Sequence, residues 1–217
     1  EILRDRSNRT IRLRQRGSIC NLLNKELPNW ETAPLDSLAI IPMQPRSNLS
    51  QQNQDLDSIF CTPSEITQYA GIVGELNWIT NTSVDFIYAT RWCARFMKAP
   101  THYNMKQLHQ VVSCLARIQR LDLDGLILGG MEGVQLIGIA DTSYQAFPDL
   151  RSGTGGTIHM SHTTGSIMSM CEKQSITADS AMAAEGVGGP LMTRRILPLR
   201  YFLGELLFPQ NLPSKFY

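Results

Sequence analysis

The spacing of apolar residues changes near Asp122, and this change divides the chain into a helical part and a sheet-forming part. Between Thr62 and Arg120, apolar residues recur every three or four positions, which is the period of an amphipathic helix face. After Asp122 they form short strand-like runs separated by glycine-rich turns. Strands in succession followed by a helix and a further strand favour an α+β domain with a mixed sheet.

The helical part, residues 62–121, is expected to contain three helices and to form a compact unit. Thr62-Pro63-Ser64-Glu65 has the N-cap residue and the acid that are typical of a helix start. Pro100 should end the second helix. We expect Trp78 and Trp92 to pack in the core. The predicted helices cover residues 66–79, 83–97 and 101–120.

The sheet-forming part, residues 122–217, contains two acids that could bind a metal together. Asp141 closes the apolar run 134–141, and Glu185 lies in the helix predicted from Asp179 onward. A carboxylate at the end of a central strand that faces one from the next helix can bind a divalent cation near a phosphate. The predicted strands cover residues 126–128, 134–140, 155–160 and 166–170, and a further strand begins at residue 214.

Residues 1–27 read as a basic hairpin followed by a short helix over 19–27. Six arginines occur in the first sixteen residues, which indicates either contact with phosphates or a solvated basic hairpin. The candidate nucleic-acid contacts here are Arg4, Arg6, Arg9, Arg12 and Arg14.

Residues 28–61 are rich in proline and polar residues, so we expect a long linker that does not pack and is partly disordered. The five cysteines form no C-x-x-C pair, which argues against a zinc site or a disulfide framework and suits a reducing compartment. There is no apolar run of eighteen residues, so no membrane partner is expected. No signal peptide is recognised, and the start at Glu1 suggests a piece of a longer protein.

Several short motifs in the helical part follow one another in an order that one family shares. They are Val73-Gly74, Leu76, Thr80-Asn81-Thr82, Asp85, Tyr88-Ala89, Arg95-Phe96-Met97 and Pro100-Thr101. With the basic hairpin before them, they resemble the end of the reverse transcriptase in the Pol polyprotein of copia-type retrotransposons.

The resemblance continues through the sheet-forming part. The segment 140–144 is similar to the first metal-ligand motif of the family's ribonuclease H domain, with Asp141 on the acid. The segments 149–155 and 208–213 are also similar, and Lys173-Gln174 leads to the second acid at Glu185.

This resemblance implies a ribonuclease H-like fold, with the helical unit and the basic hairpin before it. The implied activity is hydrolysis of the RNA strand of an RNA–DNA hybrid with two Mg²⁺ or Mn²⁺ ions. Asp141 and Glu185 would be the metal-binding and catalytic residues. The implied partners are the hybrid or a template–primer duplex and the remaining reverse transcriptase, in a cytoplasmic particle or the nucleus. Candidate contacts with the duplex in this part are Arg151, Ser152, Lys173 and Gln174.

The chain also departs from the family pattern. The third metal-binding Asp is expected about two residues beyond Tyr217, so the two-metal site is incomplete in this chain, and no Tyr-x-Asp-Asp polymerase motif occurs. An interior proline costs a helix about 3 kcal/mol and a glycine nearly 1 kcal/mol. We therefore expect the helix after Glu185 to be kinked by Gly186, Gly188, Gly189, Pro190 and Pro198.

Two other functions fit the same residues. The first is a non-catalytic module in which the arginine hairpin and the helices hold a nucleic-acid duplex. The second is a domesticated interaction protein that docks a partner at the open sheet edge beyond Tyr217, because an unpaired strand invites pairing. The oligomeric state stays open.

Overall fold

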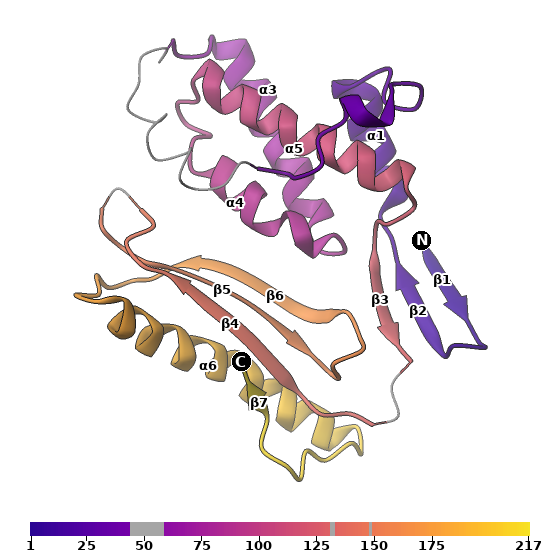
Figure 1. Ribbon diagram of the computed structural model, residues 1–217, viewed down its shortest axis with the longest axis vertical. Coiled ribbons are helices and arrows are strands. Elements are labelled where there is room, and N and C mark those ends of the chain that lie inside the picture. Colours follow the sequence, from indigo (N-terminus) through magenta and orange to yellow (C-terminus); the bar gives the residue numbers. More distant parts are fainter. Residues whose placement is uncertain (44–58, 131–132, 148) are drawn as a thin grey trace. The chain divides into compact units, whose positions relative to one another are not determined.

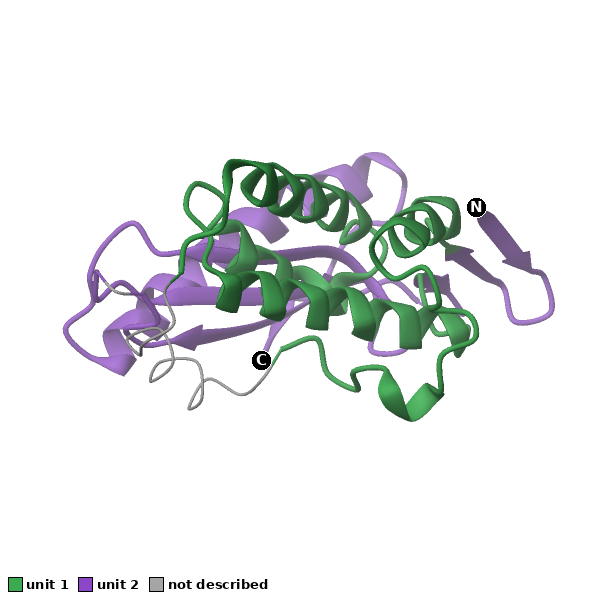
Figure 2. Ribbon diagram, turned by 90° about the horizontal axis from the view of Figure 1, so that it is seen from above, with its two compact units in different colours: residues 1, 13–125 green, residues 2–12, 126–217 purple. Residues whose placement is uncertain are grey.

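The computed structural model describes residues 1–43, 59–130, 133–147 and 149–217. The chain forms two compact units, which are coloured separately in Figure 2. The helical unit comprises residue 1 and residues 13–125, and the sheet unit comprises residues 2–12 and 126–217. The boundary at residue 125 lies close to Asp122, where the sequence pattern changes.

Helices α1, α3, α4 and α5 make up most of the helical unit (Figure 1). Both α3 and α5 begin with a capping box, in which Thr62 pairs with Glu65 and Thr101 pairs with Asn104. The predicted first and third helices are confirmed, whereas the second is shorter than predicted and is preceded by a 3₁₀ turn. The bounds are Arg16–Glu26 for α1, Pro63–Ile79 for α3, Ile87–Ala94 for α4 and His102–Arg120 for α5, with 3₁₀ turns η1 at Leu35–Ser37 and η2 at Val84–Phe86.

The core of this unit confirms one tryptophan prediction and contradicts the other. Trp92 is buried, but the Trp78 side chain is 61% exposed. The buried residues of α3 include Leu76 and Ile79, and Trp78 is two positions after Leu76. A helix turns by about 100° per residue, so a side chain two positions on points away from the buried face. The helical period therefore predicted the buried face of α3 correctly, and Trp78 lies outside that face.

The prediction that residues 28–61 do not pack is wrong for the described residues 28–43. Trp30, Leu38 and Met43 are buried in the same core as the four helices. The Trp30 indole Nε1 donates a hydrogen bond to Asn24 Oδ1 at 2.8 Å. A few apolar side chains are enough to dock a segment whose average composition is polar, because each buried one contributes about 1.5–3 kcal/mol. Cys61, at the end of the predicted linker, is also buried, and residues 44–58 lie outside the described residues.

The sheet unit contains two sheets. The three-stranded sheet has the order β1-β2-β3, and it includes the predicted N-terminal hairpin, which is confirmed. The four-stranded sheet has the order β6-β5-β4-β7, with β4–β5 and β5–β6 antiparallel and β4–β7 parallel. The bounds are Ile2–Asp5 for β1, Thr10–Leu13 for β2, Leu126–Gly129 for β3, Ile137–Ser143 for β4, Gly153–His159 for β5, Ser166–Lys173 for β6 and Lys215–Phe216 for β7.

Helix α6, Ala181–Glu205, packs along the four-stranded sheet (Figure 1). The kink expected after Glu185 stays a prediction, but Pro190 and Pro198 do not end the helix, which runs through both. Each proline removes one backbone donor, and the burial of Met192 and Ile196 against the sheet offsets that loss.

One of the glycines that weaken α6 as an isolated helix is required by its packing. A Cβ atom on Gly188 would lie 2.6 Å from Thr142 Oγ1 on β4, so only glycine lets the helix approach this closely. The chain is thus an α+β protein with helices and two sheets. No helix of the described residues combines the length and apolar character needed to cross a membrane.

Candidate functional site

Asp141 lies on an inner strand of the four-stranded sheet. Strand β4 has β5 on one side and β7 on the other, so the predicted central position is confirmed. Asp141 pairs with Gly155 on β5, and the strand continues to Ser143, two residues further than its apolar run suggested. The side chain of Asp141 is exposed, which leaves its carboxylate accessible to a cation or a phosphate.

The faces of β4 follow from its contacts with α6. A Cβ atom on Gly138 would contact Ile196 and Met192 of α6, and Thr142 Oγ1 is close to Gly188. Alternate residues of a strand point to opposite faces. Asp141 therefore points to the face opposite α6.

Glu185 comes from the second turn of α6 and contacts the same end of β4. Its Oε1 accepts a hydrogen bond at 3.2 Å from the backbone N–H of Thr142, the residue that follows Asp141. The Ala140 N–H donates to Tyr217 O on the β7 side. Because N–H groups two residues apart on a strand point the same way, the Thr142 N–H also lies on that side. Both carboxylates thus lie at the end of β4, with Glu185 on its β7 side.

Gln174 fixes the start of α6 next to Glu185. Its Nε2 donates to Thr154 Oγ1 at 2.9 Å and to the Ala184 carbonyl at 2.8 Å. Gln174 is almost fully buried, so it cannot contact a duplex as predicted and instead holds the helix that carries Glu185. A buried polar side chain is costly unless it is hydrogen-bonded, which explains a structural role for this residue.

Ser152 is the second predicted duplex contact that the structure places inside the protein. It is fully buried, and its Oγ accepts a hydrogen bond from the Gln145 N–H at 3.2 Å. Its hydroxyl shapes the loop between β4 and β5. No sequence signal indicates this burial, because serine is mostly an exposed residue.

Lys173 and Arg151 are at the surface but share an acidic partner. Lys173 Nζ forms a hydrogen bond with Asp149, and Arg151 Nε lies 3.6 Å from Asp149 Oδ2. The Lys173 hydrogen bond holds the pKa of the Asp149 carboxyl below its ordinary value. A phosphate that contacts Lys173 would have to compete with this carboxylate.

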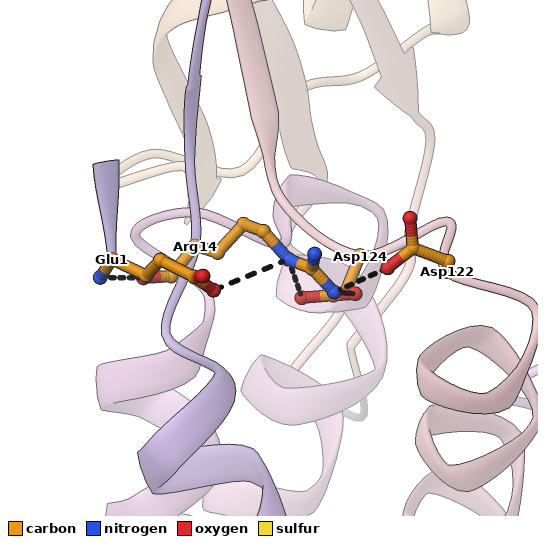
Figure 3. A network of polar contacts seen from close by, with 4 residues as sticks. All are labelled: Glu1, Arg14, Asp122 and Asp124. Atoms are coloured by element: carbon orange, nitrogen blue, oxygen red, sulfur yellow. Dashed lines mark hydrogen bonds and ion pairs between the residues drawn. The ribbon is translucent and has the colours of Figure 1, made fainter. Parts of the chain in front are cut away.

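Arg14 is removed from the set of phosphate contacts by its burial. Figure 3 shows its polar contacts with Glu1, Asp122 and Asp124. Its Nε and Nη2 donate to the Asp124 carboxylate at 2.9 and 2.5 Å, and its Nη2 lies 2.7 Å from Asp122 Oδ1. Hydrogen bonding to Asp124 raises the pKa of Arg14 above its ordinary value, so it stays charged. Arg14 is a structural cation of the helical unit.

The remaining hairpin arginines divide by exposure. Arg4, Arg6 and Arg9 are exposed, and Arg12 is half-buried with polar contacts of its own. The turn between the strands is fixed by Asp5, whose carboxylate accepts hydrogen bonds from Ser7 and Asn8. The Ser7 hydroxyl is the main reason that the Asp5 pKa is lowered to about 2. The hairpin therefore presents three exposed cations on a well-ordered turn.

A pocket of about 490 Å³ lies at the other end of β4, away from Asp141. Its lining includes Val134, Ile137, His162 and Gln210. Because Ile137 begins the strand and Asp141 is near its end, this pocket and the two acids are separate features of the sheet unit.

In comparisons with known proteins, no family model, curated protein or solved structure matches the chain. The described residues bring no third His, Cys, Asp or Glu ligand atom close enough to Asp141 and Glu185 to complete a cluster of three. The two acids are oxygen donors of the kind that Mg²⁺ and Mn²⁺ prefer, so the donor set fits these ions in part.

Proposed function

We propose that this chain is a retroelement reverse transcriptase and ribonuclease H segment that binds an RNA–DNA hybrid. In the complete protein it hydrolyses the RNA strand at a two-metal site that includes Asp141 and Glu185. The observation that carries the proposal is the hydrogen bond from the Thr142 N–H to Glu185, which brings an acid of α6 to the end of β4 beside Asp141. Such an activity belongs in a cytoplasmic particle or the nucleus, where retroelement RNA is copied.

The topology of the sheet unit supports the proposal. A ribonuclease H-like domain implies a mixed sheet. The sheet unit has three antiparallel strands, the crossover helix α6, and the strand β7, which returns parallel to β4. The crossover delivers Glu185 and β7 to the same edge of β4. The end of β4, which carries Asp141, thus receives a second acid, Glu185, from α6.

The register of β7 supports the expected place of a third acid. Ile137 pairs with Lys215 and Gly138 with Phe216. A strand that continued in this register would place the second residue after Tyr217 opposite Asp141. Paired residues of adjacent strands point to the same face. An acid at that position would share the face of Asp141, as the resemblance to the copia-type family requires.

The residues of this chain have distinct tasks in this proposal. Two bound divalent ions would activate a water and neutralise charge at the scissile phosphate. Asp141 and Glu185 hold the cations, while Gln174 and Gly188 keep α6 close enough to β4 for Glu185 to reach its place. The exposed Arg4, Arg6 and Arg9 contact phosphates without reading bases.

The test is cleavage of a labelled RNA–DNA hybrid with Mg²⁺ or Mn²⁺, with this chain and with a chain that continues past Tyr217. We expect the longer chain to cleave the RNA strand. Asp141→Asn and Glu185→Gln should each lower its cleavage rate at least about a hundredfold, since metal ligation supplies several kcal/mol to the transition state. Glu205→Gln is the matched control, because this exposed acid lies at the opposite end of α6 from Glu185. A rate unchanged by Asp141→Asn contradicts the proposal.

A non-catalytic hybrid-binding scaffold is the second candidate, and the exposed arginines of the hairpin favour it. The same experiment separates the two functions. If the longer chain retains hybrid binding in a gel-shift assay but does not cleave with either metal, the scaffold is the correct function.

A further inference from the structure

Three different metal-ligating side chains meet in the helical unit, at the starts of α3 and α5. Cys61, Glu65 and His102 offer ligand atoms that all lie within 4.8 Å of one another. Cys61 is buried, whereas the side chains of Glu65 and His102 are 40% and 53% exposed. A thiolate, a carboxylate and an imidazole are each among the ligands that zinc accepts in proteins.

The backbone holds two of these residues in place before any ion binds. Phe60 and Thr101 form an isolated antiparallel bridge. On either side of it, the Cys61 N–H donates to Pro100 O at 3.0 Å and the His102 N–H donates to Ile59 O at 3.2 Å. Cys61 and His102 are far apart in the sequence, and this bridge fixes their separation. A ligand pair that is fixed in advance loses little conformational entropy on binding.

The third ligand is oriented by a capping box. Glu65 Oε2 accepts hydrogen bonds from the Thr62 N–H at 2.7 Å and from the Thr62 hydroxyl at 2.8 Å. Outer-shell hydrogen bonds of this kind fix the direction of a ligating carboxylate. The same oxygen lies 3.5 Å from His102 Nε2. A tetrahedral zinc ion with ordinary bond lengths would separate its nitrogen and oxygen ligands by about 3.4 Å.

We propose that Cys61, Glu65 and His102 bind one Zn²⁺ ion, with water at a fourth, solvent-facing position. The ion would be electrically balanced, because a thiolate and a carboxylate carry two negative charges against its two positive charges. Thiolate and imidazole ligands select zinc over Mg²⁺ and Ca²⁺, which prefer oxygen donors. The site ties the segment before α3 to the start of α5. It is independent of the proposed hybrid cleavage, which uses residues of the sheet unit.

The sequence pattern argued against a zinc site because no two cysteines are closely spaced. This site needs only one cysteine, and its three ligands come from two segments that meet through the bridge at Phe60. The alternative is an exposed Glu65–His102 ion pair beside a buried thiol. Such a pair contributes about 0–1 kcal/mol and would show no preference for zinc.

The test is titration of the full chain with Co²⁺, a spectroscopic substitute for zinc, in a buffer free of thiol reductants. We expect the near-ultraviolet charge-transfer band of a cobalt–thiolate bond at one ion per chain, and its loss when Zn²⁺ is added. Zinc should also raise the midpoint of thermal unfolding, because an ion that binds only the folded chain stabilises it.

Three variants and one control make this test specific. Cys61→Ser should abolish the band, and Glu65→Gln and His102→Gln should weaken Co²⁺ binding by more than about a hundredfold, the upper range for outer-shell changes. Glutamine at position 65 retains the capping box, so loss of binding there cannot be attributed to loss of the helix start. The partly buried Cys20 is the control, and Cys20→Ser should retain the band. Absence of the band in the native chain, or an equal band in Cys61→Ser, overturns the proposal.

Discussion

Arg14 of the helical unit and the two acids of the sheet unit, Asp141 and Glu185, have opposite surroundings. The helical unit buries Arg14 and satisfies it with Asp124, whose side chain is fully buried. The sheet unit keeps Asp141 and Glu185 exposed at the end of a strand. A buried and paired charge contributes to structure, whereas an exposed carboxylate can bind a cation from solution. The comparison assigns a structural task to one cation and leaves the two acids available for chemistry.

The helical unit also has the larger buried apolar core. The core of the helical unit draws on α1, α3, α4, α5 and the docked residues 28–43. In the sheet unit, α6 packs on the four-stranded sheet. Large apolar side chains stay exposed there, among them Tyr201 on α6 at 73% and Leu207 just after α6 at 87%. We therefore expect the helical unit to be the more stable of the two. All three tryptophans, Trp30, Trp78 and Trp92, lie in the helical unit, so tryptophan fluorescence reports on that unit alone.

The largest expected effect is that of removing the buried cation. Arg14→Ala removes the cation that makes two hydrogen bonds to the buried Asp124 carboxylate, which should lower the free energy of unfolding by about 3–5 kcal/mol. Urea unfolding followed by tryptophan fluorescence measures the change. Arg4→Ala is the control, because Arg4 is exposed, and its effect should stay within about 0.5 kcal/mol. Equal effects of the two changes would mean that Arg14 is no different from the other hairpin arginines.

Alkaline pH should act mainly on the helical unit, through Cys93. Burial raises the pKa of this thiol from 9.0 to about 12. The unfolded chain loses the proton first, so the stabilisation is complete below pH 9 and is lost as the pH rises toward 12. The contribution of Cys93 to this loss is at most on the order of 4 kcal/mol, since one pKa unit corresponds to about 1.4 kcal/mol. Denaturant unfolding at several pH values, again followed by tryptophan fluorescence, measures it.

Cys93→Ala is the variant that sharpens this test. It should be less stable than the native chain at neutral pH, but its stability should fall less steeply between pH 9 and 12. Parallel curves for the two proteins would assign the alkaline loss to other groups.

Two glycines of α6 should give effects of opposite sign. Gly188→Ala places a Cβ atom 2.6 Å from Thr142 Oγ1 and should destabilise the sheet unit by about 1–3 kcal/mol. Gly186→Ala meets nothing within 4 Å and should stabilise the helix by up to about 1 kcal/mol. Circular dichroism during unfolding measures both, and the fluorescence transition of the helical unit should not move. Stabilisation by both changes would show that α6 lacks the close approach at Gly188.

The smallest expected effect on stability is that of the exposed hairpin arginines. Replacing Arg4 and Arg6 by alanine should change the unfolding free energy by no more than about 0.5 kcal/mol. Binding to an RNA–DNA hybrid should weaken, and the slope of log affinity against log salt concentration should decrease by about 0.9 for each phosphate that the hairpin no longer neutralises. Affinity that does not respond to salt would argue against phosphate contact by the hairpin.

The sequence was most informative where local signals were strong. The apolar period predicted both α3 and α5, and the capping residue Thr62 marked the start of α3. The alternating pattern before Thr10 and after it predicted the hairpin. Asp141 was also correctly predicted on an inner strand. These features depend on residues that are close together in the chain, so short windows of sequence contain the relevant information.

Long-range pairing explains where the sequence failed. Arg14 looked like its exposed neighbours, and only Asp124, more than a hundred residues away, makes it a buried structural cation. Gln174 looked like a surface residue, and only the arrival of α6 supplies the Ala184 carbonyl that it binds. Trp78 looked like a core residue because its type is apolar, although it lies off the buried stripe.

By itself the sequence determined most of the helices and strands, and the position of Asp141 on an inner strand. Tertiary structure decided that Gly188 serves close packing, that residues 28–43 dock in the core, and that Cys61 meets His102 across a backbone bridge. The physical reason is the same in each case. Local propensity acts over one turn or one strand, whereas burial and side-chain pairing depend on which distant segment arrives at the other side of the contact.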